Sequence, residues 1–380
     1  MVQDHANNNP ALRKPMPVLL SIGIIARNEA HNIHHTIASL FQQNVFRELS
    51  ARGALVEILC MVNGSTDKTA AVVRELFAAA SMTHPHRRQF TARAHIIAEA
   101  GKPNAVNEFI HTYSAKGARY LVLMDADITF VHKTAIWNLI LGLEHNPIGV
   151  VTVGKPLKSI TAGKTSGVRK RLSIATSRMT QSVPAQITGQ LYCIRAATAR
   201  KIHFPRALTS CDDGFVKNLV CTDFGKHPSQ TSRIITVPDA AHNFDAYMPL
   251  KHVIMNQKRQ MMGQTFLHIL MDQFIPNLDP AEHDDLACRI RELESQRPSW
   301  LSELMTQHLH KTRYFWRLFP GFLTFRFRRL QSFPILKQAQ LFPAALAGFV
   351  VTLLAGWLAA RALRKGVSQY WPELRTLKNP

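Results

Sequence analysis

The sequence predicts an α/β protein built on a doubly wound sheet. Four short apolar runs of strand length alternate with stretches whose apolar residues recur at helical spacing. A cluster of polar residues follows each run, and in an open parallel sheet such clusters meet at the carboxyl edge of the strands, where ligands bind. This alternation is typical of a doubly wound domain. The four runs are residues 18–25, 55–62, 94–97 and 120–124.

The run at 120–124 ends in two carboxylates, Asp125 and Asp127. Side chains alternate faces along a strand, so residues two apart project to the same side. Two hard oxygen ligands at this edge suit Mg²⁺ or Mn²⁺, and such an ion can hold a nucleotide diphosphate. An Asp-x-Asp after a strand also caps the next helix or simply ends the strand. The tripeptide alone leaves both interpretations open.

Polar turns follow the first three runs as well. Asn28 could cap the first helix, and Asn63 begins an Asn-Gly turn after which Ser65 or Thr66 could cap a helix over 69–80. Lys102 stands at the start of the next helix, where backbone N–H groups and the helix dipole favour an anion. Each turn fits a nucleotide-binding role and also an ordinary capping role.

The balance of charge indicates an anionic partner. Lys and Arg outnumber Asp and Glu by 46 to 25, which gives a formal net charge of +21. An acidic membrane surface or a phosphorylated substrate fits this charge. Nucleic acid is not expected, because the sequence has no helix-turn-helix, zinc finger or aromatic single-strand platform. The five cysteines show no metal spacing and are odd in number, which fits a reducing cytosol. No signal peptide is expected in the polar residues 1–17.

The later part of the chain changes character twice. A strand is expected over 148–153, followed by a basic stretch from Lys155 to Arg171 that is either a solvated loop or a clamp on phosphate or anionic lipid. Amphipathic helices are expected over 252–274, 281–293 and 301–310. Residues 311–338 then mix aromatic residues with arginines, as interfacial segments do. The uncharged residues 338–360 have the length of a bilayer span, with basic flanks on both sides, so they span the membrane, lie in its plane or form a buried helix.

The order of these polar turns resembles that of the family 2 glycosyltransferases, which have the GT-A fold. The likeness covers about residues 18 to 225. It rests on six pieces that occur in the family's order: Ala26-Arg-Asn-Glu29, Asn63-Gly-Ser-Thr-Asp67, Gly101-Lys-Pro-Asn-Ala-Val-Asn107, Asp125-Ala-Asp127, Gly189-Gln-Leu-Tyr-Cys-Ile-Arg195 and Cys211-Asp-Asp-Gly-Phe215.

The resemblance implies the fold of the first part of the chain, and composition divides the rest. The expected fold is a GT-A doubly wound mixed sheet with flanking helices, followed by a helical, membrane-associated C-terminal region. The parts are a polar N-terminal arm (1–17), a nucleotide-sugar transferase domain (18–250), a helical extension (251–310), a basic-aromatic interfacial segment (311–338), a hydrophobic membrane helix (339–363) and a basic tail (364–380).

The resemblance also implies roles for individual residues. Lys102 and Arg259 would contact the diphosphate. Asp127 would ligate Mn²⁺ or Mg²⁺ directly, while Asp125 would reach the ribose or a water on the metal. Asn63 departs from the family, which usually has Asp there, so a charged contact to the base is lost. The nucleoside is assigned to Ala26, Asn28, Glu29, Asn63 and Asp67, and the acceptor side to Gly189, Gln190 and Tyr192.

The catalytic base of such enzymes is the second acid of a pair that opens a helix, which here makes Asp213 the base and Asp212 its neighbour. Ser210-x-x-Asp213 is also a capping-box pattern. A helix N-terminus lowers the pKa of a carboxyl group, whereas a neighbouring acid and a dry pocket raise it. The sequence does not decide the balance.

The expected function is that of a membrane-associated, inverting glycosyltransferase. It would move a sugar from a nucleotide diphosphate sugar, UDP by family likeness, to a lipid-linked or envelope-glycan acceptor. The expected location is the inner (cytoplasmic) membrane, with the catalytic domain facing the cytosol and anionic lipids as partners. A processive polysaccharide synthase is an alternative, although the Gln-x-x-Arg-Trp motif of such enzymes is altered around Arg259. The other alternative is a non-catalytic GT-A module that serves in membrane assembly.

Overall fold

The computed structural model describes residues 16–159, 186–208, 210–245, 250–312, 314–319 and 321–366. Its centre is one mixed sheet with the strand order β3-β2-β1-β4-β7-β6-β8-β5. The strands are β1 (Val18–Ala26), β2 (Leu55–Asn63), β3 (Phe90–Ile97), β4 (Tyr120–Asp125), β5 (Thr129–Phe130), β6 (Val151–Ser159), β7 (Leu191–Arg195) and β8 (Ile234–Asp245).

The parallel half of the sheet confirms the predicted α/β class. Strands β3, β2, β1 and β4 run parallel, and β1, β2 and β4 are buried over most of their length, as expected for strands covered on both faces. β7 pairs antiparallel with both β4 and β6, which makes the sheet mixed. The sheet therefore has the GT-A arrangement that the resemblance implied.

Two strand boundaries differ from the prediction. β3 begins at Phe90 rather than Ala94, because its first residues alternate between buried and exposed and so lack a continuous apolar run. β6 begins at Val151 rather than Ile148, since Ile148 is 67 % exposed in the turn before the strand. β6 also continues to Ser159 along β8. The rest of the predicted basic loop, from 160 onward, lies outside the described residues.

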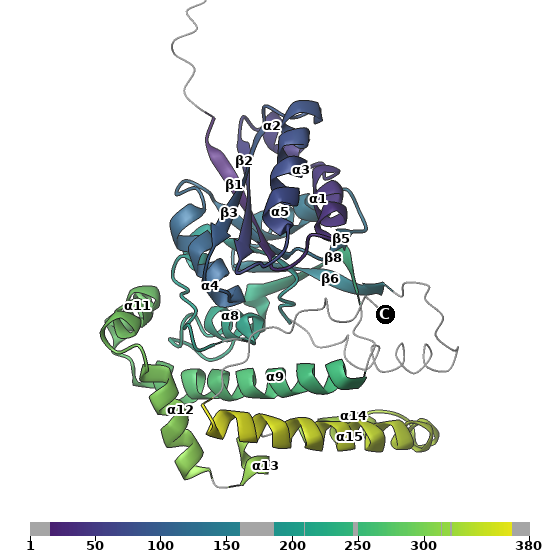
Figure 1. Cartoon of the computed structure of the whole chain (residues 1–380), viewed down its shortest axis with the longest axis vertical. Helices are drawn as coiled ribbons and strands as arrows, with labels where there is room; N and C mark the ends of the chain where they lie inside the picture. The colour runs from purple at the N-terminus through teal and green to yellow at the C-terminus, as the bar shows by residue number, and fades with distance from the viewer. Residues whose placement is uncertain are drawn as a thin grey trace, which may run out of the picture.

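Helices cover both faces of the sheet (Figure 1). On one face, α1 (Ile33–Phe41), α2 (Val45–Ala51), α3 (Thr69–Thr83) and α5 (Ala135–Glu144) share a hydrophobic core with β1, β2 and β4. On the other face lie α4 (Lys102–Asn107), the π-helical turn Glu108–Tyr113, α7 (Ala196–Ala199) and α8 (Asp212–Cys221). Arg195, at the end of β7, donates to the Leu143 and Gly149 carbonyls and so caps the C-terminal end of α5.

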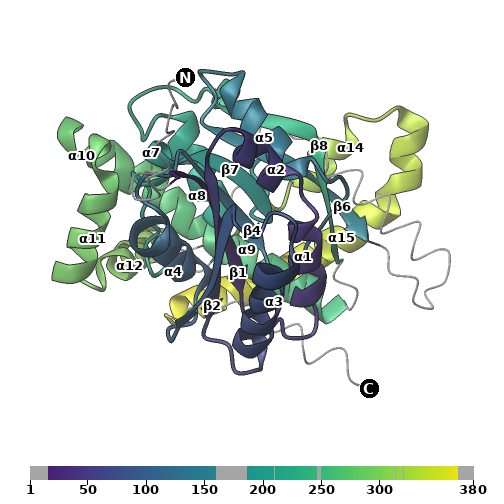
Figure 2. The same ribbon diagram turned by 90° about the horizontal axis from the view of Figure 1, so that it is seen from above.

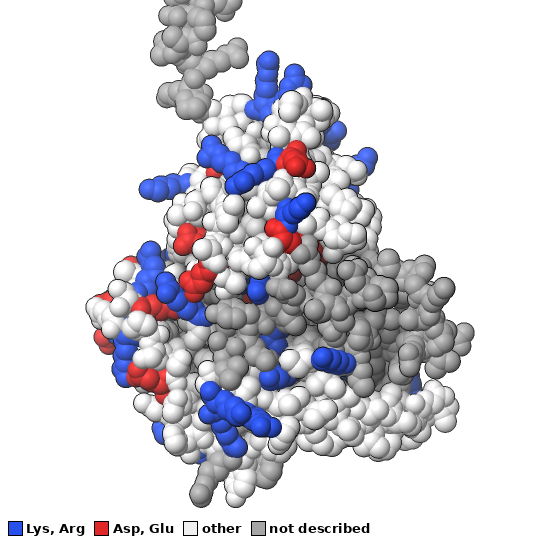
Figure 3. Space-filling view, in the orientation of Figure 1, with Lys and Arg blue, Asp and Glu red and all other residues white. Residues whose placement is uncertain are grey.

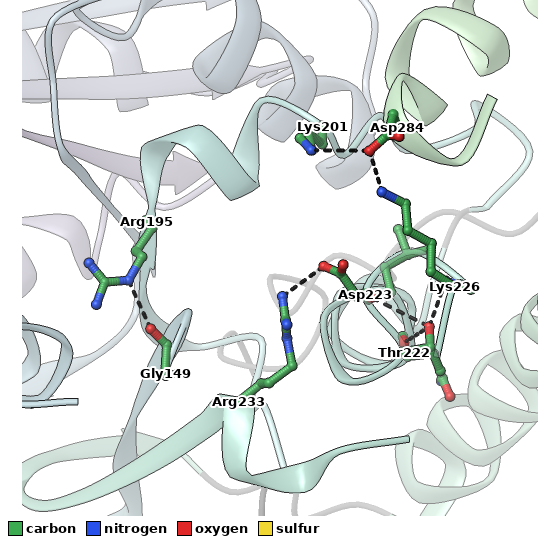
Figure 4. Close-up of polar contacts among 11 residues, drawn as sticks. Gly149, Arg195, Lys201, Thr222, Asp223, Lys226, Arg233 and Asp284 are labelled. Carbon is green, nitrogen blue, oxygen red and sulfur yellow. Dashed lines mark hydrogen bonds and ion pairs between the residues drawn. The ribbon is translucent and has the colours of Figure 1, made fainter. Parts of the chain in front are cut away.

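A helical extension packs below α8. It consists of α9 (Leu250–Ile269), the turns Leu270–Phe274 and Ile275–Asn277, α10 (Pro280–Asp284), α11 (Leu286–Gln296) and α12 (Trp300–Lys311). The helix predicted over 281–293 is two helices, because Asp285 leaves helical geometry and its side chain caps α11. Figure 4 shows how the extension is tied to the sheet domain: Lys201 and Lys226 both pair with Asp284 of α10.

The C-terminal part contains α13 (Phe315–Leu318), α14 (Phe325–Leu330) and α15 (Ile335–Arg364). α15 extends the predicted hydrophobic helix at both ends and runs beside α9 (Figure 1 and Figure 2). Within the described ranges it is the one helix long and apolar enough to cross a bilayer. The predicted N-terminal arm up to residue 15, and the basic tail from 367, lie outside the described residues. All five cysteines are free.

Candidate active site

Three elements bring charged side chains together at the carboxyl edge of the sheet, beside the turn that precedes β7. Asp125 is the last residue of β4, Lys102 is the first residue of α4, and Asp212 and Asp213 open α8. Gly189 lies in the turn before β7. A β-carbon at Gly189 would lie 3.6 Å from an Asp212 oxygen and 3.6 Å from the Asp213 β-carbon. The acids predicted as metal ligands and those predicted for catalysis therefore meet in one place.

Lys102 links these two pairs of acids. Its Nζ donates to Asp125 Oδ1 at 2.7 Å and to the Gly189 carbonyl at 2.9 Å, and it lies 3.7 Å from Asp212 Oδ2. Burial lowers the pKa of Lys102, but the charges of Asp125 and Asp212 outweigh burial and raise that pKa overall. Lys102 is therefore a fixed cation between the carboxylates. The predicted contact with a diphosphate requires one of these hydrogen bonds to be exchanged, and it stays a prediction.

Asp125 and Asp127 fit a divalent cation that also binds phosphate. Burial, together with the negative charges of Asp125 and Glu29, raises the pKa of Asp127 to about 7. A cation would relieve this concentration of negative charge. The described residues contain no cluster of three or more His, Cys, Asp or Glu placed to hold a metal. Mg²⁺ is commonly held by one or two carboxylates while waters and substrate phosphates complete its ligands, so a two-carboxylate site suits it.

The acid pair at α8 lies in a setting that favours a general base. Burial and the charge of Asp212 raise the pKa of Asp213 to about 6, although the Gly214 N–H donates to Asp213 Oδ1 at 2.8 Å and opposes the shift. The capping box that the sequence allowed is not formed, because the Ser210 hydroxyl donates instead to the Arg259 carbonyl at 3.0 Å. Burial and the neighbouring acid therefore outweigh the helix N-terminus, and the pKa of Asp213 is raised.

The turns after β1 and β2 form one hydrogen-bonded unit. Asn28 N–H donates to Ser65 Oγ at 3.0 Å, and Asn28 Oδ1 accepts from Thr66 N–H at 2.8 Å. Asp67 Oδ2 accepts from Ala30 N–H at 3.1 Å. Residues 26–29 and 63–67, both assigned to the nucleoside, thus form adjoining walls of the same edge.

The capping roles that the sequence allowed in these turns are not formed. Asn28 does not cap α1: it has φ 55° and its side chain bonds across to the second turn. Ser65 and Thr66 do not cap α3, because the Asp67 carboxylate takes the Thr69 N–H at 2.9 Å. In both cases the polar side chain forms its hydrogen bonds with the other turn, which is far away in sequence. It therefore does not bond to the helix end beside it.

Asn63 joins the two turns to the start of α4. Its amide donates to the Ala26 carbonyl at 3.1 Å and accepts from the Gly101 N–H at 3.0 Å, and the residue is 2 % exposed. Both ends of the amide are used in holding the backbone around the site. Asn63 therefore shapes the predicted nucleoside pocket through Ala26 and Gly101, and a direct contact with a base stays a prediction.

The residues assigned to the acceptor side lie beside the acid cluster at different depths. Gln190 accepts from the Asp125 N–H through its carbonyl at 2.9 Å, and its side-chain Oε1 is 3.3 Å from His242 Nε2. Tyr192 is 4 % exposed, and burial together with the charge of Asp212 raises its pKa. Tyr192 thus lies beneath the cluster, whereas Gly189 borders it.

The sequence analysis missed Gly263, a glycine inside α9. A β-carbon there would lie 2.2 Å from Ser210 Oγ and 2.9 Å from the Ser210 carbonyl. Because Gly263 has no side chain, α9 can pack closely against the segment that carries the acid pair. The Ser210 hydroxyl then reaches the Arg259 carbonyl. The signal was available, since a lone glycine within a helical pattern often marks a close approach of two backbones.

We expect Gly263→Ala to lower kcat while leaving donor affinity within a factor of about two, because the added methyl group displaces Ser210 and the acids that follow it. Steady-state kinetics beside calorimetric donor binding separate the two effects. Ser210→Ala in the same chain removes the closest contact and should restore part of kcat. Gly117→Ala is the matched control, since its β-carbon meets nothing within 4 Å. Equal kcat in Gly263→Ala and wild type would show that this contact is not needed.

The mixed sheet carries one carboxylate pair after β4 and a second pair that opens α8, an arrangement that fits a glycosyltransferase. Residues 21–200 match the family model described as Glycosyl transferase family 2. No curated protein matches the chain.

Solved structures similar to this chain are distant from it. A glucosyl-3-phosphoglycerate synthase from Mycobacterium tuberculosis, in complex with Mn²⁺, UDP-glucose and phosphoglyceric acid, is 15 % identical, with 69 % of this chain and 82 % of that chain covered and a TM-score of 0.44. The same synthase with Mg²⁺ and UDP is 15 % identical over 67 % and 80 %, with a TM-score of 0.42. S. aureus TarS 1–349 is 15 % identical over 93 % of each chain, with a TM-score of 0.43.

Proposed function

We propose that this glycosyltransferase acts at the membrane, with inversion, on a nucleotide diphosphate sugar and the hydroxyl of a lipid-linked or envelope-glycan acceptor. One observation carries the proposal. Asp213 is an acid whose pKa is raised to about 6. Lys102 and a carboxylate pair suited to a metal ion lie at the same site, where they could bind the departing diphosphate. A general base works best when its pKa lies near the working pH.

The reaction is one displacement. Asp213 accepts the proton of the acceptor hydroxyl as that oxygen forms a bond to the anomeric carbon of the sugar. The bond from the anomeric carbon to the β-phosphate oxygen breaks, and its electron pair leaves with the nucleotide diphosphate. Lys102 offers positive charge to that leaving group. Attack and departure on opposite faces of one carbon invert its configuration.

Asp127 and Asp125 are the residues that would hold Mn²⁺ or Mg²⁺. When bound, such an ion supplies Lewis-acid stabilisation of the diphosphate oxygens. The chain's own contribution is to keep both carboxylates at the end of β4 and to balance Asp125 with Lys102.

UDP is the proposed nucleotide by family likeness. Transfer of one sugar, or of very few, is favoured over processive synthesis because Asn256 and Gln260 replace the Gln and Trp of the processive motif around Arg259. The catalytic domain is placed in the cytosol, because nucleotide sugars are made and used there, and the membrane is the inner (cytoplasmic) one. The non-catalytic alternative is disfavoured by the presence of Asp125, Asp127 and Asp213 in one cluster.

A donor screen tests the proposal. Detergent-held protein is incubated with Mn²⁺ or Mg²⁺, a membrane extract as acceptor source and each common nucleotide sugar in turn, and released nucleotide is measured. Release with one donor, dependent on the extract, is the expected result and names the sugar. If nucleotide binds but no donor turns over, the protein is a non-catalytic module.

Asp127→Ala should weaken metal-dependent UDP binding by at least about 100-fold, because loss of a residue that only supports a metal ligand already costs up to that much. Titration calorimetry with UDP, in Mn²⁺ and then in EDTA, checks this. The matched control is Asp239→Ala, an exposed acid on β8. If UDP bound equally well to Asp127→Ala and EDTA had no effect, the proposed role of a metal ion in binding the nucleotide would be wrong.

A further inference from the structure

The two faces of α15 differ in the size of their side chains. The face toward the protein carries mostly small residues, including the buried Ala345, Ala355, Gly356 and Ala359. Met261 of α9 approaches so closely that a β-carbon at Gly356 would lie 3.0 Å from its methyl group. Small residues allow α15 to lie against α9 along its length (Figure 1).

The opposite face of α15 carries large apolar side chains that the described residues leave exposed. These side chains recur every three or four positions and therefore form one stripe. Val350 is 59 % exposed and Trp357 is 51 % exposed. The stripe consists of Phe342, Leu346, Val350, Leu354 and Trp357. A helix that is apolar all round is normally buried on every side, so this stripe requires an apolar partner.

Polar contacts on the protein side fix the middle of α15. The Arg326 guanidinium donates to Thr352 Oγ1, and the Thr352 hydroxyl donates to Gln257 of α9 at 3.1 Å. A β-carbon at Gly348 would lie 2.5 Å from Arg326 Nε, so the glycine makes room for the guanidinium. If α15 spanned a bilayer in this packing, it would carry an arginine and a glutamine to the hydrocarbon centre, which is costly.

Charge identifies the partner as an anionic surface. Residues 312–366 contain no Asp or Glu. Exposed basic residues lie at both ends of the stripe: Lys337 before it, Arg361 and Lys365 after it. The Arg361 guanidinium lies 5.6 Å from the Trp357 ring, an aromatic-cation pair of the kind found at membrane interfaces. In Figure 3 the lower right of the molecule, over α14 and the adjoining part of α15, shows white atoms and no red ones.

We infer that α15 lies in the plane of an anionic lipid bilayer, with the stripe from Phe342 to Trp357 in the acyl boundary and α9 on the cytosolic side. Interfacial helices insert their apolar face to this shallow depth while flanking basic residues stay among the headgroups. The same arrangement satisfies Arg326 and Thr352 inside the protein. A second copy of the chain is a poorer partner for the stripe, because two such basic surfaces repel each other.

The inference deepens the membrane association proposed above and links it to the site. α9 contacts α15 on one side, through Gln257 and Met261, and on the other it holds the segment before the acid pair, through Gly263 and the Arg259 carbonyl. An acceptor carried in the same membrane would therefore reach the site from the side of α9.

Vesicle flotation of the full chain tests the surface without any donor, so its outcome is separate from that of the donor screen. Vesicles of phosphatidylcholine alone are compared with vesicles that also contain phosphatidylglycerol. We expect binding to the anionic vesicles and a loss of at least about tenfold in Val350→Glu/Leu354→Glu, since two charges enter the stripe. The control is Ile96→Glu, because Ile96 is also 59 % exposed but lies on β3. Equal binding by both variants, or no preference for anionic lipid, would overturn the inference.

A depth scan distinguishes an in-plane helix from a spanning one. Single cysteines at positions 342, 350 and 357, in a Cys288→Ser background, carry a fluorophore that is quenched by lipids labelled at different depths. The in-plane arrangement gives equal, shallow depths at all three positions. A spanning helix gives the greatest depth at 350, and a stripe covered by a second copy gives no lipid quenching and a doubled mass in solution. Either of these two results would be contrary to the inference.

Discussion

Asp213→Asn is expected to lower kcat by about 10²- to 10⁴-fold, the usual contribution of a positioned general base. The amide keeps the size of the carboxyl group but cannot accept the proton of the acceptor hydroxyl. Donor binding should change little, because the residues assigned to the nucleotide lie on β1, β2, β4, α4 and α9 or in the turns after β1 and β2, rather than on α8. Steady-state nucleotide release and calorimetric donor binding check the two halves of this prediction.

The pH dependence follows from the same residue. Burial and Asp212 raise the pKa of Asp213 to about 6, so the reactive carboxylate is lost as the pH falls through that value. In the wild type, kcat should fall about tenfold per pH unit below 6 and level off above it. The asparagine variant should lack this limb. A pKa raised by folding means that ionised Asp213 costs stability above its ordinary titration range, so the variant should be no less stable at pH 7. An unchanged pH profile in the variant would assign the base elsewhere.

Lys102→Met is expected to have the largest effect on stability, about 3–5 kcal/mol, the range for breaking a buried ion pair on one side. Without the ammonium group, Asp125 and Asp212 face each other across a partly buried site with no compensating charge. Turnover should fall as well, because the leaving diphosphate loses a cation and the Gly189 carbonyl loses its partner. Urea unfolding and nucleotide release measure these two losses.

The variant's stability should recover as the pH is lowered. Uncompensated carboxylates have raised pKa values, so the folded variant takes up protons more readily than the unfolded chain and gains stability toward acid. Lys102→Arg keeps the charge and is the matched control, although its planar group cannot copy the contacts of an ammonium. If Lys102→Met were as stable as wild type at pH 8, the pairs around Lys102 would be weaker than their geometry indicates.

The fold was largely predictable because its central strands are buried on both faces. β1, β2 and β4 read as continuous apolar runs, and each prediction agrees with the structure to within about a residue at its ends. Edge elements were less predictable. β5 has only two residues and pairs with β8, more than a hundred residues later, so no local pattern marks it.

The site was predictable in its residue types but not in its contacts. The sequence order placed Lys102, Asp125 and Asp212 at strand and helix ends, yet only the structure shows that one ammonium group bridges the two acids. Lys102 and the Gly189 carbonyl are 87 positions apart, and such a pairing leaves no periodic trace. The same reason explains why the sequence could not decide the role of Asn28, whose side chain bonds to a turn 38 positions away rather than to its own helix.

The most direct test of the mechanism is the anomeric configuration of the first product. With the donor named by the screen, proton NMR of the purified product gives the coupling constant of the anomeric proton, which is compared with that of the donor. A single displacement with Asp213 as base predicts the opposite configuration in the product. Retention of the donor's configuration would contradict the account, because it requires a different sequence of bond changes at the anomeric carbon.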